Sequence, residues 1–139
     1  MSETSIIRTF YDKEETQLNE EYFQVNGKKE GIYKQYWKNG NLKEICNYIN
    51  GEMNGIYKLY YENGQLFQIC NYINYKKNGI YKVYHEDGQL MSEANYINDK
   101  LSGICKEYDY NGQLISEVNY VDDEIDEIVK ILDDVIMDD

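Results

Sequence analysis

The chain has 139 residues, of which 42% are hydrophobic and 29% are charged, and this is the size and balance of one folded domain. Its net charge of −12 disfavours binding to nucleic acid or to an anionic membrane and favours a basic protein partner. No apolar run approaches the roughly 18 residues of a membrane span, and the polar N-terminus does not resemble a signal peptide. We therefore expect a cytoplasmic protein. It has 16 tyrosines and no proline, a composition that favours strands.

Residues 1–30 contain a weak copy of the pattern that fills most of the remaining chain. The stretch TQLNEEYFQVNGKKE keeps the same order of a leucine, acidic residues, an aromatic residue and Asn-Gly, but its aromatic residue is shifted by about one position. Terminal units of repeat proteins are often atypical because they close the end of the array. We predict that residues 1–30 form a degenerate repeat that caps the N-terminal end.

Four similar units follow, over residues 31–54, 55–78, 79–102 and 103–121. They begin at Gly31, Gly55, Gly79 and Gly103, which are 24 residues apart, and the second unit reads GIYKLYYENGQLFQICNYINYKKN. A strict period of this length indicates a repeat protein in which each unit buries its apolar side chains only by stacking on its neighbours.

Each unit holds an Asn-Gly or Asp-Gly pair between two alternating runs, which is typical of a two-residue type I′ hairpin turn. These pairs are Asn39-Gly40, Asn63-Gly64, Asp87-Gly88 and Asn111-Gly112. Such a turn fixes the register. On one side of the first hairpin it predicts the pairs Gly31 with Tyr48, Tyr33 with Cys46 and Trp37 with Leu42. On the other side it predicts Ile32 with Asn47, Lys34 with Ile45 and Tyr36 with Lys43.

Two features of the predicted register point to a packed first side. Where the fourth unit has the smaller Cys105 in place of tyrosine, the opposite residue becomes the larger Val118, so volume is compensated across the pair. The first glycine of each unit faces a tyrosine, and we expect the ring to lie across the bare backbone. These tyrosines are Tyr48, Tyr72, Tyr96 and Tyr120. The second side, with its lysine ladder, is predicted to be a solvated face.

The repeat ends after residue 121, and the spacing of apolar residues changes towards that of a helix. Ile125, Ile128, Val129, Leu132 and Ile136 fall on one helical stripe. Residues 122–139 also carry nine acidic residues against one basic residue. We predict an acidic amphipathic helix over residues 122–139, which either caps the last hairpin or docks onto a partner.

The sequence gives little support for catalysis or for cofactor and metal binding. Its single histidine, His85, occupies a position that differs in every unit, and we expect it to be an exposed strand residue. Cys46 and Cys70 lie in adjacent units, two strands or about 9.6 Å apart, which is too far for a disulfide. We therefore expect buried free thiols, no cofactor, no metal and no enzyme activity.

Two rows of side chains near the hairpin tips are the candidate partner-binding residues. The first row holds Trp37, Tyr61, His85 and Asp109, and the second holds Tyr36, Tyr60, Tyr84 and Tyr108. Aromatic anchors dominate the energetics of protein interfaces, so we expect these two rows to contact a partner. Ordinary cross-strand packing is the alternative for both rows.

The order Gly-x-Tyr-x-x-Tyr, Asn-Gly-x-Leu and Asn-Tyr-Ile-Asn, repeated from Gly31 to Val121, resembles the variant MORN repeats (membrane occupation and recognition nexus) of bacteria and giant viruses. The resemblance implies an elongated, twisted, single-layer antiparallel sheet of β-hairpins, which agrees with the mainly β fold that the spacing predicts. Cys105, His85 and Asp109 depart from the pattern, so partner contacts need not be uniform along the array.

The resemblance and the composition together leave three functions open. The first is a non-enzymatic protein-interaction scaffold that binds a basic partner and could dimerise through a sheet edge. The second, implied only by the resemblance, is an antitoxin-like inhibitor of a co-encoded protein. The third is a lipid-associated module, which the negative charge makes less favourable. If the source is a virus, the expected location is the host cytoplasm.

Overall fold

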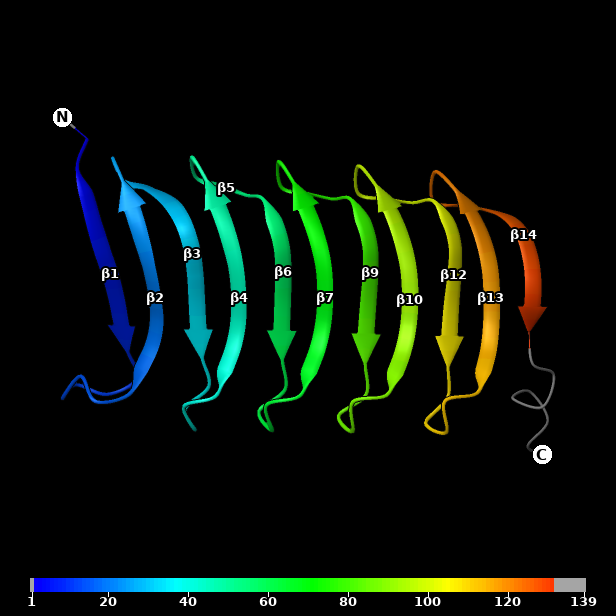
Figure 1. Cartoon of the computed structure of the whole chain (residues 1–139), viewed down its shortest axis with the longest axis horizontal. Coiled ribbons are helices and arrows are strands. Elements are labelled where there is room, and N and C mark those ends of the chain that lie inside the picture. Colours follow the sequence, from blue (N-terminus) through cyan, green and yellow to red (C-terminus); the bar gives the residue numbers. More distant parts are fainter. Residues whose placement is uncertain (1, 132–139) are drawn as a thin grey trace.

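The computed structural model describes residues 2–131, and these form one antiparallel sheet of hairpins with no helix in that range. The long strands follow one another in chain order from edge strand β1 to edge strand β14, so the sheet is a single elongated layer (Figure 1). The predicted β architecture is confirmed. The strands are β1 (Thr4–Phe10), β2 (Leu18–Val25), β3 (Lys28–Tyr36), β4 (Leu42–Ile49), β5 (Glu52–Met53), β6 (Gly55–Tyr60), β7 (Leu66–Ile73), β8 (Lys76–Lys77), β9 (Gly79–Tyr84), β10 (Leu90–Ile97), β11 (Lys100–Leu101), β12 (Gly103–Tyr108), β13 (Leu114–Val121) and β14 (Glu124–Ile131).

The hairpin tips, at the lower edge of Figure 1, are three-residue turns, so the predicted type I′ turn is wrong here. The Trp37 N–H donates to the Asn41 carbonyl at 2.8 Å, and the Gly40 N–H donates to the Trp37 carbonyl at 2.9 Å. Gly40 has a φ of +90°, whereas Asn39 has no positive φ. This is a type I turn followed by a left-handed glycine. The side-chain oxygen of Asn39 accepts the Asn41 N–H at 2.9 Å, which explains the asparagine.

Type I′ turns instead join the hairpins at the opposite end of the sheet. Asn50 and Gly51 have φ values of +51° and +83°, as this turn type requires. Successive turns at this end are also linked to one another. The Gly51 N–H donates to the Lys29 carbonyl at 2.9 Å, and the Tyr75 N–H donates to the Met53 carbonyl at 3.1 Å. Stacking of the repeats therefore continues outside the strands.

The predicted register is confirmed along most of each hairpin and fails near the tip. Gly31 pairs with Tyr48, as predicted, but Tyr36 and not Trp37 pairs with Leu42. The three-residue turn sets a register that is shifted by one residue, and a bulge between Gln35 and Tyr36 restores the predicted pairing beyond it. The predicted pairing of Cys105 with Val118 is also found.

Backbone conformation explains the glycine at the start of each unit. Gly55 has a φ of +100° and Gly79 a φ of +106°, values that residues with a Cβ rarely adopt. A Cβ added at Gly31 or Gly55 would meet no atom within 4 Å. The predicted explanation, a tyrosine ring across the bare backbone, is therefore wrong.

One face of the sheet, here called the tyrosine face, carries the core. Its central rows are Tyr33, Tyr57 and Tyr81, then Cys46, Cys70 and Ala94, then Tyr48, Tyr72 and Tyr96. Cys46 and Cys70 each expose only 2% of their surface, and Tyr33 exposes 7%. The rings of Tyr57 and Tyr72 meet edge to face with centroids 5.7 Å apart. In a sheet of one layer, tyrosine rings thus cover the small residues in place of a second layer.

The thiols on this face are free, as predicted. Burial raises the pKa of the Cys46 thiol to about 12, and the neighbouring Glu44 carboxylate adds to this rise. Burial also raises the pKa of the Tyr48 hydroxyl to about 12, with a smaller contribution from Cys46. The Cys46 thiol and the Tyr48 hydroxyl therefore stay uncharged near neutral pH, so they can pack against each other without burying a charge.

The opposite face, here called the isoleucine face, is apolar but uncovered. Ile32, Ile56, Ile80 and Ile104 lie in one row on it and expose 46%, 52%, 55% and 47% of their surface. A lysine follows each of them two residues later, so it points to the same face. The sequence predicts a solvated face here, and the structure adds a continuous row of exposed isoleucines.

The predicted C-terminal helix is wrong for the residues that the structure describes. Residues Glu124–Ile131 form β14, which pairs with β13, whereas residues 132–139 of the predicted helix lie outside the described residues. Asp122 and Asp123 have φ values of +48° and +69°, like the other turns at this end of the sheet. This turn directs the chain back along β13. Backbone hydrogen bonds to the open edge of β13 stabilise a strand more than a few apolar residues at helical spacing stabilise an isolated helix.

Candidate functional site

Aromatic side chains at the tips join each hairpin to the next. Trp37 donates its indole N–H to the Tyr60 carbonyl at 3.1 Å, and the Tyr61 hydroxyl donates to the Tyr84 carbonyl at 2.6 Å. Both bonds reach the next repeat, and a carbonyl of a half-buried residue gains a partner in each case. The first predicted row is thus partly engaged in contacts between repeats.

The N-terminal hairpin follows the same arrangement. Tyr11 lies in the loop between β1 and β2, and its hydroxyl donates to the Tyr36 carbonyl at 2.6 Å. Asp12 shapes this loop by accepting the N–H groups of Thr16 and Gln17 at 3.0 Å and 2.8 Å. Hydrogen bonds from Thr16 and Gln17 lower the pKa of the Asp12 carboxyl. The loop therefore places Tyr11 as Trp37 is placed one hairpin later.

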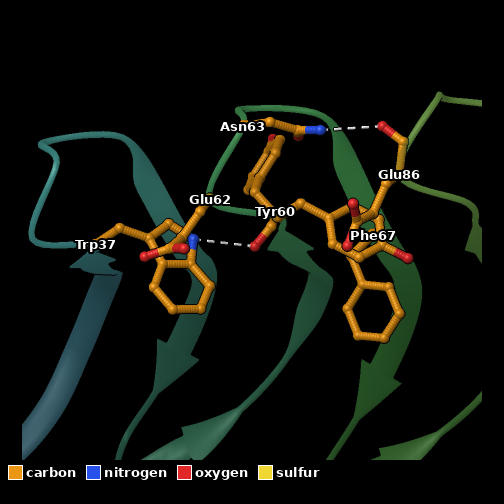
Figure 2. A pocket seen from close by; sticks show the side chains of 7 residues that line it. Trp37, Tyr60, Glu62, Asn63, Phe67 and Glu86 are labelled. Atoms are coloured by element: carbon orange, nitrogen blue, oxygen red, sulfur yellow. Dashed lines mark hydrogen bonds between the residues drawn. The ribbon is translucent and has the colours of Figure 1, made fainter.

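Asparagine side chains form a second set of links between the tips. Asn39 donates through Nδ2 to the Glu62 carbonyl at 2.8 Å, and Asn63 donates to the Glu86 carbonyl at 3.1 Å, the bond drawn in Figure 2. Asp87 takes the equivalent place in the third unit, and its carboxylate side chain has no N–H group to donate. The links thus differ between the N-terminal and C-terminal halves of the sheet.

A groove of about 410 Å³, here called the tip groove, runs along the hairpin tips of the first three repeat units. Figure 2 shows Trp37 reaching towards the following hairpin, with its bond to the Tyr60 carbonyl. The rings of Tyr61 and Phe67 have centroids 4.8 Å apart in the same groove. Its lining residues are Trp37, Tyr60, Tyr61, Glu62, Asn63, Phe67 and Glu86.

The tip groove combines aromatic rings with carboxylates. Glu62 and Glu86 are exposed residues of the lining. The ammonium group of Lys43 lies 4.6 Å from the centroid of the Trp37 ring, so a cation already sits on this ring. Burial raises the pKa of the Tyr61 hydroxyl, and Glu86 adds to the rise, so Tyr61 stays a neutral donor. The groove is therefore suited to a cationic group.

The other two members of the first predicted row have different surroundings. His85 exposes only 5% of its surface and stacks on Tyr110 at 4.3 Å between centroids, so the expectation of an exposed histidine is wrong. Among the residues described, neither of its ring nitrogens has a hydrogen-bond partner. Asp109 accepts the N–H groups of Asn111 and Gln113, both at 2.9 Å, and so closes its own turn.

The second predicted row is half-buried along its whole length. Its members Tyr36, Tyr60, Tyr84 and Tyr108 all fall in this intermediate class. Tyr60 lines the tip groove, whereas Tyr84 lines a groove on the isoleucine face with Ile80 and Lys82. The structure therefore divides the second row between two surfaces.

Sequence reasoning missed the isoleucine face as a candidate surface. Each unit begins with Gly-Ile, and the predicted pairing of Ile32 with Asn47 puts these isoleucines on one side. The available signal was the row of isoleucines on one side of a predicted single-layer sheet, because no element was predicted to cover that side.

Residues 2–131 hold no group of three or more histidine, cysteine, aspartate or glutamate side chains arranged to bind a metal ion. No helix long and apolar enough to cross a membrane is found over the same range.

Comparison with known proteins supports the repeat but adds no individual function. The MORN repeat variant pattern matches residues 29–50, 53–74, 77–98 and 101–122, which together are more than half of the chain. No curated protein sequence matches the chain. The crystal structure of TarM is similar to 88% of this chain with a TM-score of 0.43 and 11% identity. This match spans only 21% of that protein.

Proposed function

Because this chain belongs to the MORN repeat variant family, we propose that it is a protein-binding module whose tip groove holds an arginine or lysine side chain of a basic partner. The observation that carries this proposal is the presence of four aromatic residues and the carboxylates of Glu62 and Glu86 in one groove. Cations bind over aromatic faces, and tryptophan and tyrosine are frequent anchors at interfaces. The net charge of −12 would also speed the encounter with a basic partner.

The rigid links between the tips support the same proposal. Trp37 and Tyr61 are held by hydrogen bonds to the next hairpin, so their rings are positioned before a partner arrives. Groups that are already ordered lose less conformational freedom on binding, which leaves more of the interaction energy for affinity. The proposal assigns the module a binding role and no reaction of its own.

The single tryptophan of the chain makes a direct test possible. A short peptide of arginine and glycine is titrated into the full chain while the fluorescence of Trp37 is followed. We expect a saturable change that weakens as salt is added, because the contact is a charged one. A peptide with neutral citrulline in place of arginine should produce no such change.

Variants of the carboxylates then locate the site. Glu62→Gln combined with Glu86→Gln should weaken peptide binding by about tenfold or more, since it removes both charges from the groove. Glu52→Gln combined with Glu124→Gln changes the net charge equally at the other end of the sheet and should have little effect. Equal weakening by both pairs, or equal binding of the citrulline peptide, would contradict the proposed site.

A further inference from the structure

One row of side chains crosses the whole isoleucine face through paired positions on successive strands. Charges alternate at its two ends. Arg8 on β1 pairs with Glu21 on β2, and their side chains form an ion pair at 2.8 Å. Lys82 on β9 pairs with Glu93 on β10, with an ion pair at 3.9 Å. Opposite charges on neighbouring strands thus neutralise each other at both ends of the row.

The centre of the row lacks these carboxylates. Lys58 on β6 pairs with Ile45 on one neighbouring strand and with Ile69 on the other. Within residues 2–131, no ion pair forms with Lys58. Lys34 and Lys82 lie one repeat to either side of it. Lys34 pairs with Glu21 and Lys82 pairs with Glu93, whereas Lys58 has no carboxylate on either paired strand. The unbalanced positive charge of this face therefore lies at Lys58, although the protein carries a net charge of −12.

Three consecutive grooves occupy the same region. Their volumes are about 280, 250 and 410 Å³, and they contain Lys34, Lys58 and Lys82 respectively. The first and second grooves share Ile32 as a wall, and the second and third share Ile56. Each groove thus offers aliphatic walls and one lysine, and the first groove is also lined by Glu21.

The spacing of the grooves indicates the shape of what fits them. Successive grooves are one repeat or two strands apart, which is about 9.6 Å at ~4.8 Å per strand. Residues seven apart on an α-helix lie on one side at about 10.5 Å along the axis. An extended chain covers a similar distance in about three residues, but residues an odd number apart point to opposite sides. A helix matches the grooves and a strand does not.

We propose that the isoleucine face binds an amphipathic, acidic α-helix of a partner protein across strands β3 to β9. Apolar residues of the helix lie in the three grooves, and a carboxylate near its centre meets Lys58. The charge complementarity selects an acidic helix, because a basic one would bring its charge against Lys58, which has no carboxylate on a paired strand. This surface is separate from the tip groove, so it does not depend on the function proposed there.

The test uses a labelled synthetic peptide of about 15 residues, long enough for all three grooves at ~1.5 Å per residue, with leucines on one stripe and glutamates beside it. Fluorescence anisotropy measures its binding to the full chain. The variant Ile56→Ala with Lys58→Gln should reduce the affinity by about tenfold or more. Ile73→Ala with Lys76→Gln, a pair of exposed residues at the other end of the same hairpin, should leave it within about twofold.

Two further peptides decide the chemistry and the shape. A peptide with lysine in place of every glutamate should bind at least about tenfold more weakly, and so should one interrupted by a central proline. The proposal is overturned if the glutamate peptide does not bind, or if the control pair of substitutions has the same effect. It is also overturned if sedimentation shows a dimer that Ile56→Ala with Lys58→Gln converts to a monomer, because a second copy then covers this face.

Discussion

The two faces of this sheet are made by alternate residues of the same strands, yet only one of them is a core. On the tyrosine face, Tyr57 lies opposite Cys70, a large residue over a small one, and Cys70 is almost fully covered because its exposed fraction is 2%. On the isoleucine face, Ile56 lies opposite Asn71 and exposes 52% of its surface. Apolar character alone therefore does not mark the core of a single-layer sheet. Matching of large and small residues across strands does.

The strongest test of this comparison introduces a charge on each face. Cys70→Asp places a carboxylate where only 2% of the residue is exposed, and we expect a loss of about 3 kcal/mol or more in the free energy of unfolding. Ile80→Asp puts the same group on a residue that is 55% exposed and should cost about 1 kcal/mol or less. Urea denaturation followed by circular dichroism measures both. Similar losses from the two variants would mean that the faces are equally packed.

High pH should destabilise the protein by ionising tyrosines of the tyrosine face. The loss should be smaller than that from Cys70→Asp, because the tyrosine rings are only partly buried. Burial raises the pKa of Tyr48 to about 12 and also raises that of Tyr57. An unfolded tyrosine ionises near ~10, so the unfolded chain loses these protons first. Stability should be fully present below about pH 10 and should decline as the pH rises towards 12.

The measurement is the urea midpoint at increasing pH, together with the ultraviolet absorbance of tyrosinate. Tyr48→Phe is the control, because it removes one titrating group and keeps the ring. Its midpoint should fall less steeply above pH 10 than that of the parent chain. An unchanged slope in Tyr48→Phe would assign the alkaline effect to other groups, such as Tyr57, whose pKa burial also raises.

Much of the fold could be predicted because equivalent positions of the four repeat units can be compared with one another. The exchange of tyrosine for Cys105 opposite the larger Val118 indicates the pairing of the strands from the amino-acid sequence alone. The repeat period and the hairpins follow from the same pattern. The candidate tip residues Trp37 and Tyr61 were found from their aromatic character, but their hydrogen bonds to the next hairpin depend on how the repeats stack.

The errors arose where local signals compete with pairing between strands. Asn39-Gly40 and Asn50-Gly51 are the same dipeptide, yet only the second adopts a type I′ turn. The bulge near Tyr36 decides between them, and no local propensity predicts it. At the C-terminal end, apolar residues with helical spacing met the open edge of β13 and formed β14. His85 was expected to be exposed because its position varies, but its stacking on Tyr110 depends on the neighbouring tip.

The smallest expected loss of stability is that of Ile56→Ala, and the helix-binding experiments depend on it because they use this substitution. Ile56 and Tyr57 are consecutive and point to opposite faces, so alanine at each position compares the two faces at one place in the chain. We expect Ile56→Ala to cost about 1 kcal/mol or less, because about half of the side chain is already in water, and Tyr57→Ala to cost about 3 kcal/mol. Thermal and urea unfolding of both variants measures the difference. If Ile56→Ala proved as costly as Tyr57→Ala, the isoleucine face would be a second core, and its grooves would not be free to bind a helix.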